Sequence, residues 1–366
     1  MNSQLLYQIA LTQVPEIGHI SAKKLIQHLG SAEEVFKANT KDLLLIPGVG
    51  MKIINSLKSK QFLQKAEKEI HYIERNDITP LFFQDKDYPN RLKHCVDGPT
   101  LLYFKGDVNF NMPKVISIVG TRTPSEHGKQ ICEKFVKSIA PTGALIISGL
   151  AYGIDVCSHQ AALDQGLKTV GVLGHGLDRL YPAQNRKVAD RMLSMGGLLT
   201  EFLPGTEPDR NNFPMRNRIV AGISDATIVI ESKASGGSLI TAKLAFDYNR
   251  DVLAFPGRPD DELSRGCNNL IKNNIAQLIN NGDDFVKILN WEKLEDNKRQ
   301  VQKSLFIDFT SEEQKIIEVI MDSKEHAIDE ISLSSEISIS KTASLLLSLE
   351  FKGAVKSLPG KRYRIA

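Results

Sequence analysis

VISIVGTR, residues 115–122, joins a continuously apolar run to a glycine, a small polar residue and an arginine. Later stretches repeat the pattern, in which an apolar run breaks into glycine and small residues, at 148–153, 173–176, 235–238 and 255–257. Buried strands of a parallel sheet are apolar on both faces, and the loops that leave them turn tightly into helices. The pattern therefore predicts an α/β fold on a doubly wound, mostly parallel sheet.

The carboxyl edge of this sheet is the expected binding site. The predicted strands, with helical patterns between them, span residues 115–119, 144–147, 169–173, 198–200, 226–230 and 252–255. In such sheets, ligands bind beyond the carboxyl ends of the strands. Helix N-termini and closely approaching glycine backbone favour an anion there. We expect phosphate binding, and at this point a nucleotide and a nucleic acid strand are both open as ligands.

Composition narrows the class of protein. The chain has 366 residues and a net charge of +3, which argues against a strongly basic nucleic-acid coat but allows a local basic groove. Its cysteines lack metal-finger or C-x-x-C spacing, which predicts a reduced, metal-free protein: Cys95, Cys132, Cys157 and Cys267. Neither a signal peptide nor a bilayer-spanning run is visible, so we expect a soluble, cytoplasmic protein without a membrane partner.

The remaining chain divides into smaller units around the sheet. Residues 1–78 are helical by period and contain Pro47-Gly48-Val49-Gly50, a turn that resembles the helix-hairpin-helix, whose backbone N–H groups bind phosphate. An earlier copy has Glu16 where the first turn glycine would stand, so a packing or interaction role stays open beside phosphate binding. The predicted domains are 1–78, 79–290 and 304–366, with a charged linker at 291–303.

The last domain has the pattern of a winged helix, with three helices and a short hairpin. Its first helix is expected to start with Thr310 as the cap and carboxylates in the first turn. The expected recognition helix, 340–350, carries only Lys341 as a base. The pattern therefore favours protein interaction over reading of duplex DNA.

Basic and aromatic residues follow the strand ends. Arg122 stands three residues after the first strand, where its guanidinium can bind a phosphate. Arg186 and Lys187 enter one helix, and Phe213, Arg216 and Arg218 lie at the start of another. An aromatic ring beside arginines is the combination that stacks a base and neutralises its phosphates. Because Arg216 and Arg218 are two positions apart on a helix, they must point to different sides, so one of them is expected to be structural.

Enzymatic motifs are missing from the sequence. Ser235-Gly236-Gly237-Ser238 with Thr241 is the plainest phosphate cradle, but neither G-x-G-x-x-G nor a P-loop occurs. No serine or cysteine stands in a nucleophile motif with His159 or His175. Asp155 is expected to cap the helix that follows it. The sequence thus predicts binding rather than dinucleotide chemistry, ATP hydrolysis or triad catalysis.

These motifs together resemble the DprA/Smf family. The resemblance covers the whole sheet domain in order and rests on SIVGTR, SGLAYGID, FPMRNRIVAG and GGSLITA, at 117–122, 148–155, 213–222 and 236–242. It implies an extended Rossmann-like fold, a homodimer, and a non-catalytic mediator without cofactor. Such a mediator binds and protects incoming single-stranded DNA and loads the recombinase RecA during natural transformation.

The resemblance also implies a set of DNA-binding residues. On this chain they are Gly120, Arg122, Ser148, Gly149, Gly174, Arg186, Lys187, Phe213, Arg216, Asn217, Arg218, Gly236, Gly237, Ser238, Thr241 and Lys243. The alternative is a nucleotide-cleaving phosphoribohydrolase of the related Rossmann group. When the loop of that group is laid on Gly236-Gly237, its acid position becomes Lys243, so the general acid or base is missing.

Overall fold

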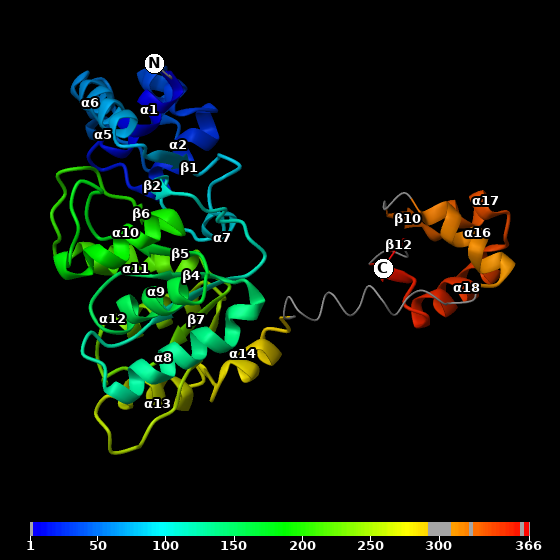
Figure 1. Ribbon diagram of the computed structural model, residues 1–366. Coiled ribbons are helices and arrows are strands. Elements are labelled where there is room, and N and C mark those ends of the chain that lie inside the picture. The colour runs from blue at the N-terminus through cyan, green and yellow to red at the C-terminus, as the bar shows by residue number, and fades with distance from the viewer. Residues whose placement is uncertain (1–2, 292–308, 322–324, 359–361, 366) are drawn as a thin grey trace. The chain divides into compact units, whose positions relative to one another are not determined.

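The computed structural model describes residues 3–291, 309–321, 325–358 and 362–365 (Figure 1). Its contacts divide the chain into two compact units, Met1–Leu294 and Glu295–Ala366. Each unit is described by itself below. The predicted linker at 291–303 lies outside the described residues, apart from Trp291.

A nine-stranded sheet forms the centre of the larger unit. The strand order is β1-β2-β6-β5-β4-β3-β7-β8-β9, and pairing from β6 to β9 is parallel throughout. The strands are β1 (Thr79–Phe82), β2 (Leu101–Gly106), β3 (Val115–Val119), β4 (Leu145–Ser148), β5 (Thr169–Val172), β6 (Gly196–Thr200), β7 (Ala226–Val229), β8 (Asp251–Ala254) and β9 (Gln277–Leu278). This confirms the predicted α/β, mostly parallel sheet, with strand ends displaced by one or two residues.

Helices cover both faces of the sheet. Successive residues of a strand point to opposite faces, so β3 contributes side chains to the cores on both sides. Ile116 and Ile118 pack in one core with α8 (Glu126–Ile139), α9 (Ile154–Asp164) and α14 (Gly282–Ile288). Val115 and Val119 pack in the other core with α11 (Asn212–Gly222), α12 (Gly237–Asp247) and α13 (Arg265–Lys272). In the strand order, β4, β5 and β6 follow on one side of β3, and β7, β8 and β9 follow on the other. The direction of winding therefore reverses between β3 and β7, which is the topological switch point.

Beside β6, α10 (Arg186–Ser194) contributes Met192 to a separate apolar cluster that also includes Leu173. Short 3₁₀ turns precede β4 and α10, at η1 (Ala140–Thr142) and η2 (Ala183–Asn185). These elements complete the cover of the sheet.

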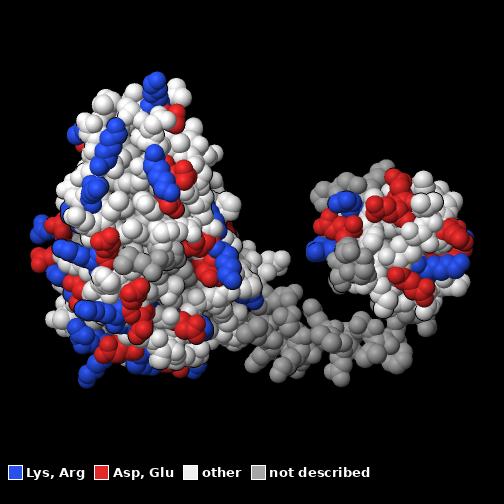
Figure 2. All heavy atoms as spheres, turned by 90° about the horizontal axis from the view of Figure 1, so that it is seen from above, with Lys and Arg blue, Asp and Glu red and all other residues white. Residues whose placement is uncertain are grey.

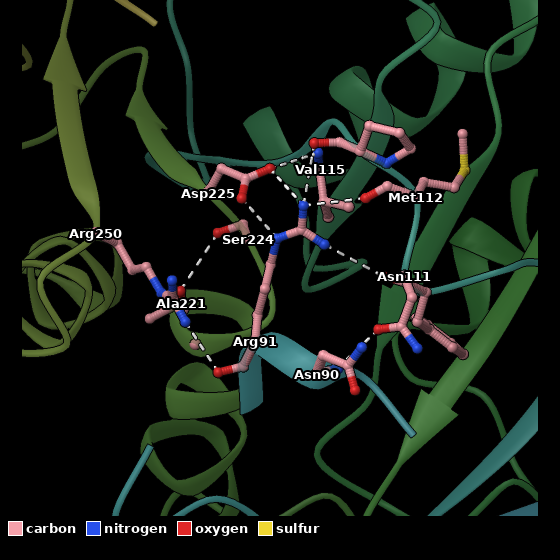
Figure 3. A network of polar contacts seen from close by, with 12 residues as sticks. Asn90, Arg91, Asn111, Met112, Val115, Ala221, Ser224, Asp225 and Arg250 are labelled. Carbon is pink, nitrogen blue, oxygen red and sulfur yellow. Dashed lines mark hydrogen bonds and ion pairs between the residues drawn. The ribbon is translucent and has the colours of Figure 1, made fainter. Parts of the chain in front are cut away.

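The segment between the helical N-terminal region and β3 extends the sheet by two antiparallel strands. β1 pairs with β2, and β2 pairs with β6. Its short helix α7 (Asn90–Lys93) carries Arg91, whose Nε and Nη2 donate to the two carboxylate oxygens of Asp225 at 2.6 and 2.8 Å (Figure 3). Asp225 also accepts from the backbone N–H of Val115, at 2.9 Å. This network ties the added strands to the amino ends of β3 and β7.

Six helices form the N-terminal region: α1 (Ser3–Thr12), α2 (His19–Leu29), α3 (Ala32–Lys37), α4 (Thr40–Leu44), α5 (Met51–Leu57) and α6 (Gln61–Arg75). Glu16 and Gly48 adopt equivalent left-handed conformations, with φ of 70° and 89°, so the imperfect copy still turns like the perfect one. Glu16 pairs with Lys52. The helices share a core with Phe82, Leu101 and Tyr103, and a domain boundary at residue 78 stays a prediction.

The smaller unit has the winged-helix architecture. Its described elements are α16 (Ser311–Ile320), β10 (His326–Ala327), α17 (Ile328–Ser335), α18 (Ile339–Phe351), β11 (Val355–Leu358) and β12 (Arg362–Ile365), with sheet order β10-β12-β11. Thr310 caps α16, and Glu313 returns the hydrogen bond, which confirms the predicted helix start. The predicted turn at 359–361 lies outside the described residues.

No helix in the described ranges is both long and apolar enough to cross a bilayer. On the face seen in Figure 2, acidic and basic side chains are interspersed over both units. The near balance of charge in the composition is therefore not organised into a single-signed coat on that face.

Candidate nucleic-acid interface

A cleft of about 690 Å³ opens at the carboxyl edge of the sheet. Its walls come from the loops after β3, β4 and β7, from one side of α11, from the first turn of α12, and from Tyr181. Because the loops after β3 and β7 flank the topological switch, the cleft occupies the position where open α/β sheets bind their ligands. We call it the switch cleft.

Arg122 lies on the exposed loop after β3. It has no hydrogen bond or ion pair within the part of the chain that the structure describes, and its guanidinium carbon lies 5.3 Å from the centroid of the Phe213 ring. The loop itself is held, because the Thr121 N–H donates to the Glu231 carbonyl at 2.8 Å. A fixed backbone with an unneutralised guanidinium is suited to bind an incoming anion.

Arg216 forms the floor of the switch cleft. Its Nη1 donates to the Val172 carbonyl at 3.0 Å, while its Nε, also buried, has no partner among the described residues. The guanidinium lies against Gly149, where a Cβ would come within 1.5 Å of Nη1. Burial lowers the pKa of Arg216 to about 10, with Asp155 opposing the shift and Arg122 adding to it. Arg216 therefore still carries its charge at neutral pH.

Asp155 faces this arginine rather than the end of its own helix. We predicted that it caps α9, but the N-cap position is Gly153 and no side chain caps this helix. The carboxylate instead accepts from the Ala151 N–H, at 3.4 Å. Burial raises the pKa of Asp155, and the nearby Arg216 opposes that shift. The capping prediction was wrong because α9 begins at Ile154, so Asp155 already lies within the first turn and Gly153 occupies the cap position.

The N-terminus of α12 opens onto the switch cleft, and α11 lines the cleft along its length. The first turn of α11 offers fewer free N–H groups, because Pro214 has none and the Asn212 N–H donates to the Asp209 carbonyl. Neither α11 nor α12 has a side-chain cap or an acidic residue in its first turn. In the middle of α11, Asn217 Nδ2 donates to the carbonyl of Gly237, the first residue of α12, at 3.3 Å. Uncapped first-turn N–H groups favour anions, and the helix dipole adds to this preference.

An aromatic pair forms one side of the opening. The rings of Tyr181 and Phe213 are 6.0 Å apart between centroids, and Tyr181 is 44% exposed. Such a ring offers a face on which a base can stack. The predicted stacking position of Phe213 is thus beside Arg122.

The charges on the walls of the switch cleft are mostly positive. Arg122, Arg210, Arg216 and Lys233 line it, and Asp155 is the acidic residue among the lining residues. Sequence reasoning missed Arg210 and Lys233. Lys233 follows β7 closely and precedes Gly236, so the same rule that identified Arg122 after β3 could have found it.

Most of the predicted site residues meet in the switch cleft: Gly120, Arg122, Gly149, Phe213, Arg216, Asn217, Gly236, Gly237, Ser238 and Thr241. Gly174 lines a small recess beside it, next to Phe213 and Tyr181. These residues come from separate loops that the parallel strands bring to one edge. Their role in binding stays a prediction.

Two predicted residues have structural partners instead. Ser148 is fully buried, and its hydroxyl donates to the Ile118 carbonyl at 2.6 Å. Arg218 is buried and donates to the Glu201 carboxylate and the Asp97 carbonyl. This agrees with the expectation that Arg216 and Arg218 point to different sides, and it identifies Arg218 as the structural one.

Three predicted bases lie outside the switch cleft. Arg186 and Lys187 are exposed on α10, and Lys243 is exposed on α12, but none of them lines the cleft. Arg186 and Lys187 were predicted from clustering along the chain, which does not say which side of a helix faces the site. Their part in binding DNA has no support from the cleft.

The histidines of the sheet have structural surroundings. His159 is fully buried with Nδ1 at 2.7 Å from the Thr169 hydroxyl, and burial lowers its pKa to about 3. His175 is also buried, and its Nε2 accepts from the Tyr181 N–H at 3.2 Å. Within the described ranges, no group of three or more His, Cys, Asp or Glu side chains is arranged to hold a metal ion.

Comparison with known proteins agrees with this architecture. Residues 79–290 match the family described as DNA recombination-mediator protein A, and residues 307–361 match the DprA winged helix domain. Protein Smf of Synechocystis sp. is 33% identical over 404 aligned residues that cover 99% of both chains. DNA processing protein DprA of Bacillus subtilis is 37% identical over 63% of this chain and 77% of its own.

Two solved structures share the fold at 30% sequence identity. DNA processing protein A from Streptococcus pneumoniae superposes with a TM-score of 0.64 over 80% of this chain and 99% of its own. The protein from Helicobacter pylori, described with its single-stranded DNA binding mode, has a TM-score of 0.54 over 59% and 97%. The chain therefore belongs to the DprA/Smf family of DNA recombination mediators.

Proposed function

We propose that the switch cleft binds single-stranded DNA and that this is how the chain acts as a recombination mediator. One observation carries the proposal. Four cationic side chains, of which Lys233 also pairs with Glu262, and the uncapped N-terminus of α12 surround a cleft whose acidic lining residue, Asp155, interacts electrostatically with Arg216. This arrangement favours a chain of phosphates over a neutral or cationic ligand.

A single strand suits the cleft better than a duplex. The exposed Tyr181 and the half-buried Phe213 offer ring faces beside Arg122, and only an unpaired base is free to stack on them. Stacking is tolerant of sequence because every base has a π-face, so we expect weak sequence preference. Support also comes from the relative of Helicobacter pylori, which is described as binding single-stranded DNA.

The enzyme alternative has little support in the switch cleft. Lys243, which takes the acid position of the phosphoribohydrolase loop, is exposed and lies off the cleft. Asp155, the carboxylate among the lining residues, is buried, and its charged form is stabilised by the nearby charge of Arg216. General acid or base catalysis needs a carboxyl within hydrogen-bond reach of the substrate. We therefore propose a binding protein without cofactor.

The wider role follows from family membership. We propose that the chain protects incoming DNA and loads RecA onto it during natural transformation, and that it acts as a homodimer in the cytoplasm. A filament-assembly assay tests this role. RecA should form filaments on DNA pre-coated with single-strand-binding protein only when this chain is added, and failure to assist assembly contradicts it.

Fluorescence anisotropy with labelled oligonucleotides tests the binding itself. We expect far tighter binding to a single strand than to a duplex of the same sequence, and a loss of about tenfold or more in Arg122→Glu. Arg75→Glu is the matched control, because Arg75 is exposed at the end of α6 and lines none of the clefts described here.

Two outcomes contradict the proposal. One is equal affinity for single strand and duplex, and the other is equal binding by the two charge-reversal variants. Release of free base from a nucleoside monophosphate, measured by chromatography, would instead support the phosphoribohydrolase.

A further inference from the structure

A second groove adjoins the switch cleft. It has a volume of about 720 Å³ and runs between α8 and α9, and we call it the α8–α9 groove. Arg122 and Thr123 line both spaces. Anything that extends from the switch cleft past the Arg122 side chain can therefore enter the α8–α9 groove.

One side of α9 forms the floor of this groove. Its lining residues on α9 include Val156, Cys157, Gln160 and Asp164, which follow the three- and four-residue spacing of a single helical face. Lys129 and Glu133, four residues apart, line it from α8. The groove is thus built on two regular helices rather than on loops.

Gly153 fixes the groove to the phosphate-binding loop. Its φ of +80° is in the region that favours glycine, and a Cβ there would lie 2.2 Å from the Thr121 carbonyl oxygen. The next residue donates from its N–H to the same carbonyl, at 3.2 Å. The start of α9 therefore lies directly against the backbone that carries Arg122.

The walls of the two spaces differ in charge. The switch cleft is strongly cationic, whereas Lys129 and Arg122 in the α8–α9 groove are balanced by Glu133 and Asp164. Lys129 pairs with Glu126 at 2.6 Å, and Asp164 pairs with Arg191 at 2.7 Å. A phosphate gains little in such a groove, whereas an uncharged, partly apolar group loses little free energy there if its polar atoms are hydrogen-bonded.

Groups that suit a nucleobase line the entrance. Tyr152 is 38% exposed, and its hydroxyl donates to Gln184 at 2.7 Å, which holds the ring in place. The exposed amide of Gln160 provides both a donor and an acceptor. We propose that the α8–α9 groove is a nucleobase subsite, which takes a base from the same strand whose phosphates lie on Arg122. This inference rests on the proposed function of the switch cleft.

Cys157 provides a built-in reporter for the subsite. It is half-buried in the groove, whereas Cys95, Cys132 and Cys267 are buried. A hydrogen bond with Cys132 lowers the pKa of Cys157, which favours its reaction with an alkylating reagent. The experiment measures the rate of Cys157 alkylation by N-ethylmaleimide, by peptide mass spectrometry on the full chain, with oligothymidylate or with an abasic oligonucleotide of equal length.

Binding of each oligonucleotide is followed in parallel by anisotropy. At about ten times the dissociation constant, oligothymidylate should slow Cys157 alkylation by about tenfold, because a bound strand protects by one plus the ratio of ligand to Kd. The abasic strand should bind more weakly and, even when bound, leave the rate near that of the free protein. Protection by both strands alike would overturn the base subsite.

Tight binding of oligothymidylate without protection of Cys157 would also overturn the subsite, but it would leave the switch cleft intact as a DNA site. If the chain binds no single-stranded DNA at all, both the proposed role of the switch cleft and the nucleobase subsite are contradicted. The two proposals therefore fail in different ways in the same experiment.

A matched pair of variants tests the subsite without chemical modification. Gln160→Glu places a carboxylate in the groove, and a base would have to desolvate it. Gln165→Glu adds the same charge at the exposed end of α9, outside the groove. We expect Gln160→Glu to weaken binding of oligothymidylate severalfold more than Gln165→Glu, and equal effects would contradict a base in the groove.

Discussion

Arginines at the two edges of the same sheet have opposite surroundings. At the amino edge, Arg91 forms a bidentate ion pair with Asp225 and donates to the Met112 carbonyl at 3.0 Å (Figure 3). At the carboxyl edge, Arg122 has no such partner among the described residues, and the buried Nε of Arg216 has none either. At the amino edge the fold neutralises Arg91, whereas at the carboxyl edge it leaves Arg122 without a carboxylate partner within the described ranges and available to a ligand.

The difference separates stability from function. A guanidinium whose hydrogen bonds are satisfied by the fold contributes to folding, and its removal leaves buried acceptors without a donor. A guanidinium that lines a cleft without a carboxylate partner contributes little to folding and much to anion binding. The same residue type thus predicts different losses at the two edges.

The largest effect is expected at the amino edge. Asp225→Ala removes the carboxylate that binds both Arg91 and the Val115 N–H, and should lower the free energy of unfolding by about 3 kcal/mol. Urea unfolding followed by the fluorescence of Trp291, the single tryptophan, measures this loss. Lys37→Ala breaks an exposed ion pair and should change stability by less than about 0.5 kcal/mol. A small loss in Asp225→Ala would remove the contrast between the edges.

The next test asks whether the position of Arg216 at the carboxyl edge matters for binding. Gly149→Ala forces the Arg216 guanidinium away, because the added Cβ would lie 1.5 Å from Nη1. Single-strand affinity should fall by about tenfold or more. Gly237→Ala adds the same methyl group to the cleft wall, with 3.7 Å to the nearest neighbour, and should cost less. Equal losses in anisotropy would show that the place of Arg216 does not matter.

Much of this edge could be predicted because strand ends are local features. The run 115–119 was predicted with the bounds that β3 has, and Arg122 follows from that strand alone. The antiparallel pairing of β2 with β6 could not be predicted in the same way, since it joins segments about ninety residues apart in sequence. The two added strands appeared in the sequence only as short apolar pieces.

The side to which a helical side chain points was only partly predictable. Spacing on a helix shows that Arg216 and Arg218 diverge, but it does not say which one faces the cleft. Glu201, which pairs with Arg218, directly follows β6. Only the folded chain brings it next to α11, so the sequence pattern of α11 does not reveal it. Clustering along the chain likewise did not show that Arg186 and Lys187 lie outside the switch cleft, and their role in binding stays a prediction.

Salt dependence gives a finer measure of the carboxyl edge. Each phosphate contact on a single strand contributes about 0.7 to the slope of log affinity against log salt. Arg122→Ala should reduce the slope by about that amount, with stability nearly unchanged because Arg122 is exposed. Arg186→Ala should leave the slope unchanged. An equal reduction in both variants would show that the strand extends from the cleft over α10.

The contrast between charged side chains with and without partners in the fold also applies to an acidic residue, Glu69. Glu69 on α6 is largely buried, its Oε1 has no hydrogen-bond partner among the described residues, and it lines none of the clefts described here. Burial, with a smaller contribution from the charge of Asp178, raises the pKa of Glu69 from 4.5 to about 7. An unpartnered charge away from any cleft should therefore oppose folding.

The smallest expected effect is the pH dependence that Glu69 causes. Its pKa is higher in the folded than in the unfolded chain, so between about 4.5 and 7 the folded state binds more protons. The stability that the folded state gains from protonated Glu69 is fully present below pH 4.5 and is lost as the pH rises through 7. Glu69→Gln should remove this dependence and stabilise the protein by about 1 kcal/mol at pH 8, measured by urea unfolding. This is less than the roughly 3 kcal/mol that the full pKa shift corresponds to, because the side chain is partly exposed to water. If Glu69→Gln has the same stability as the unchanged protein at pH 8, water already solvates the Glu69 carboxylate. In that case the presence of ion-pair partners, and not burial, would determine which charged side chains the fold tolerates.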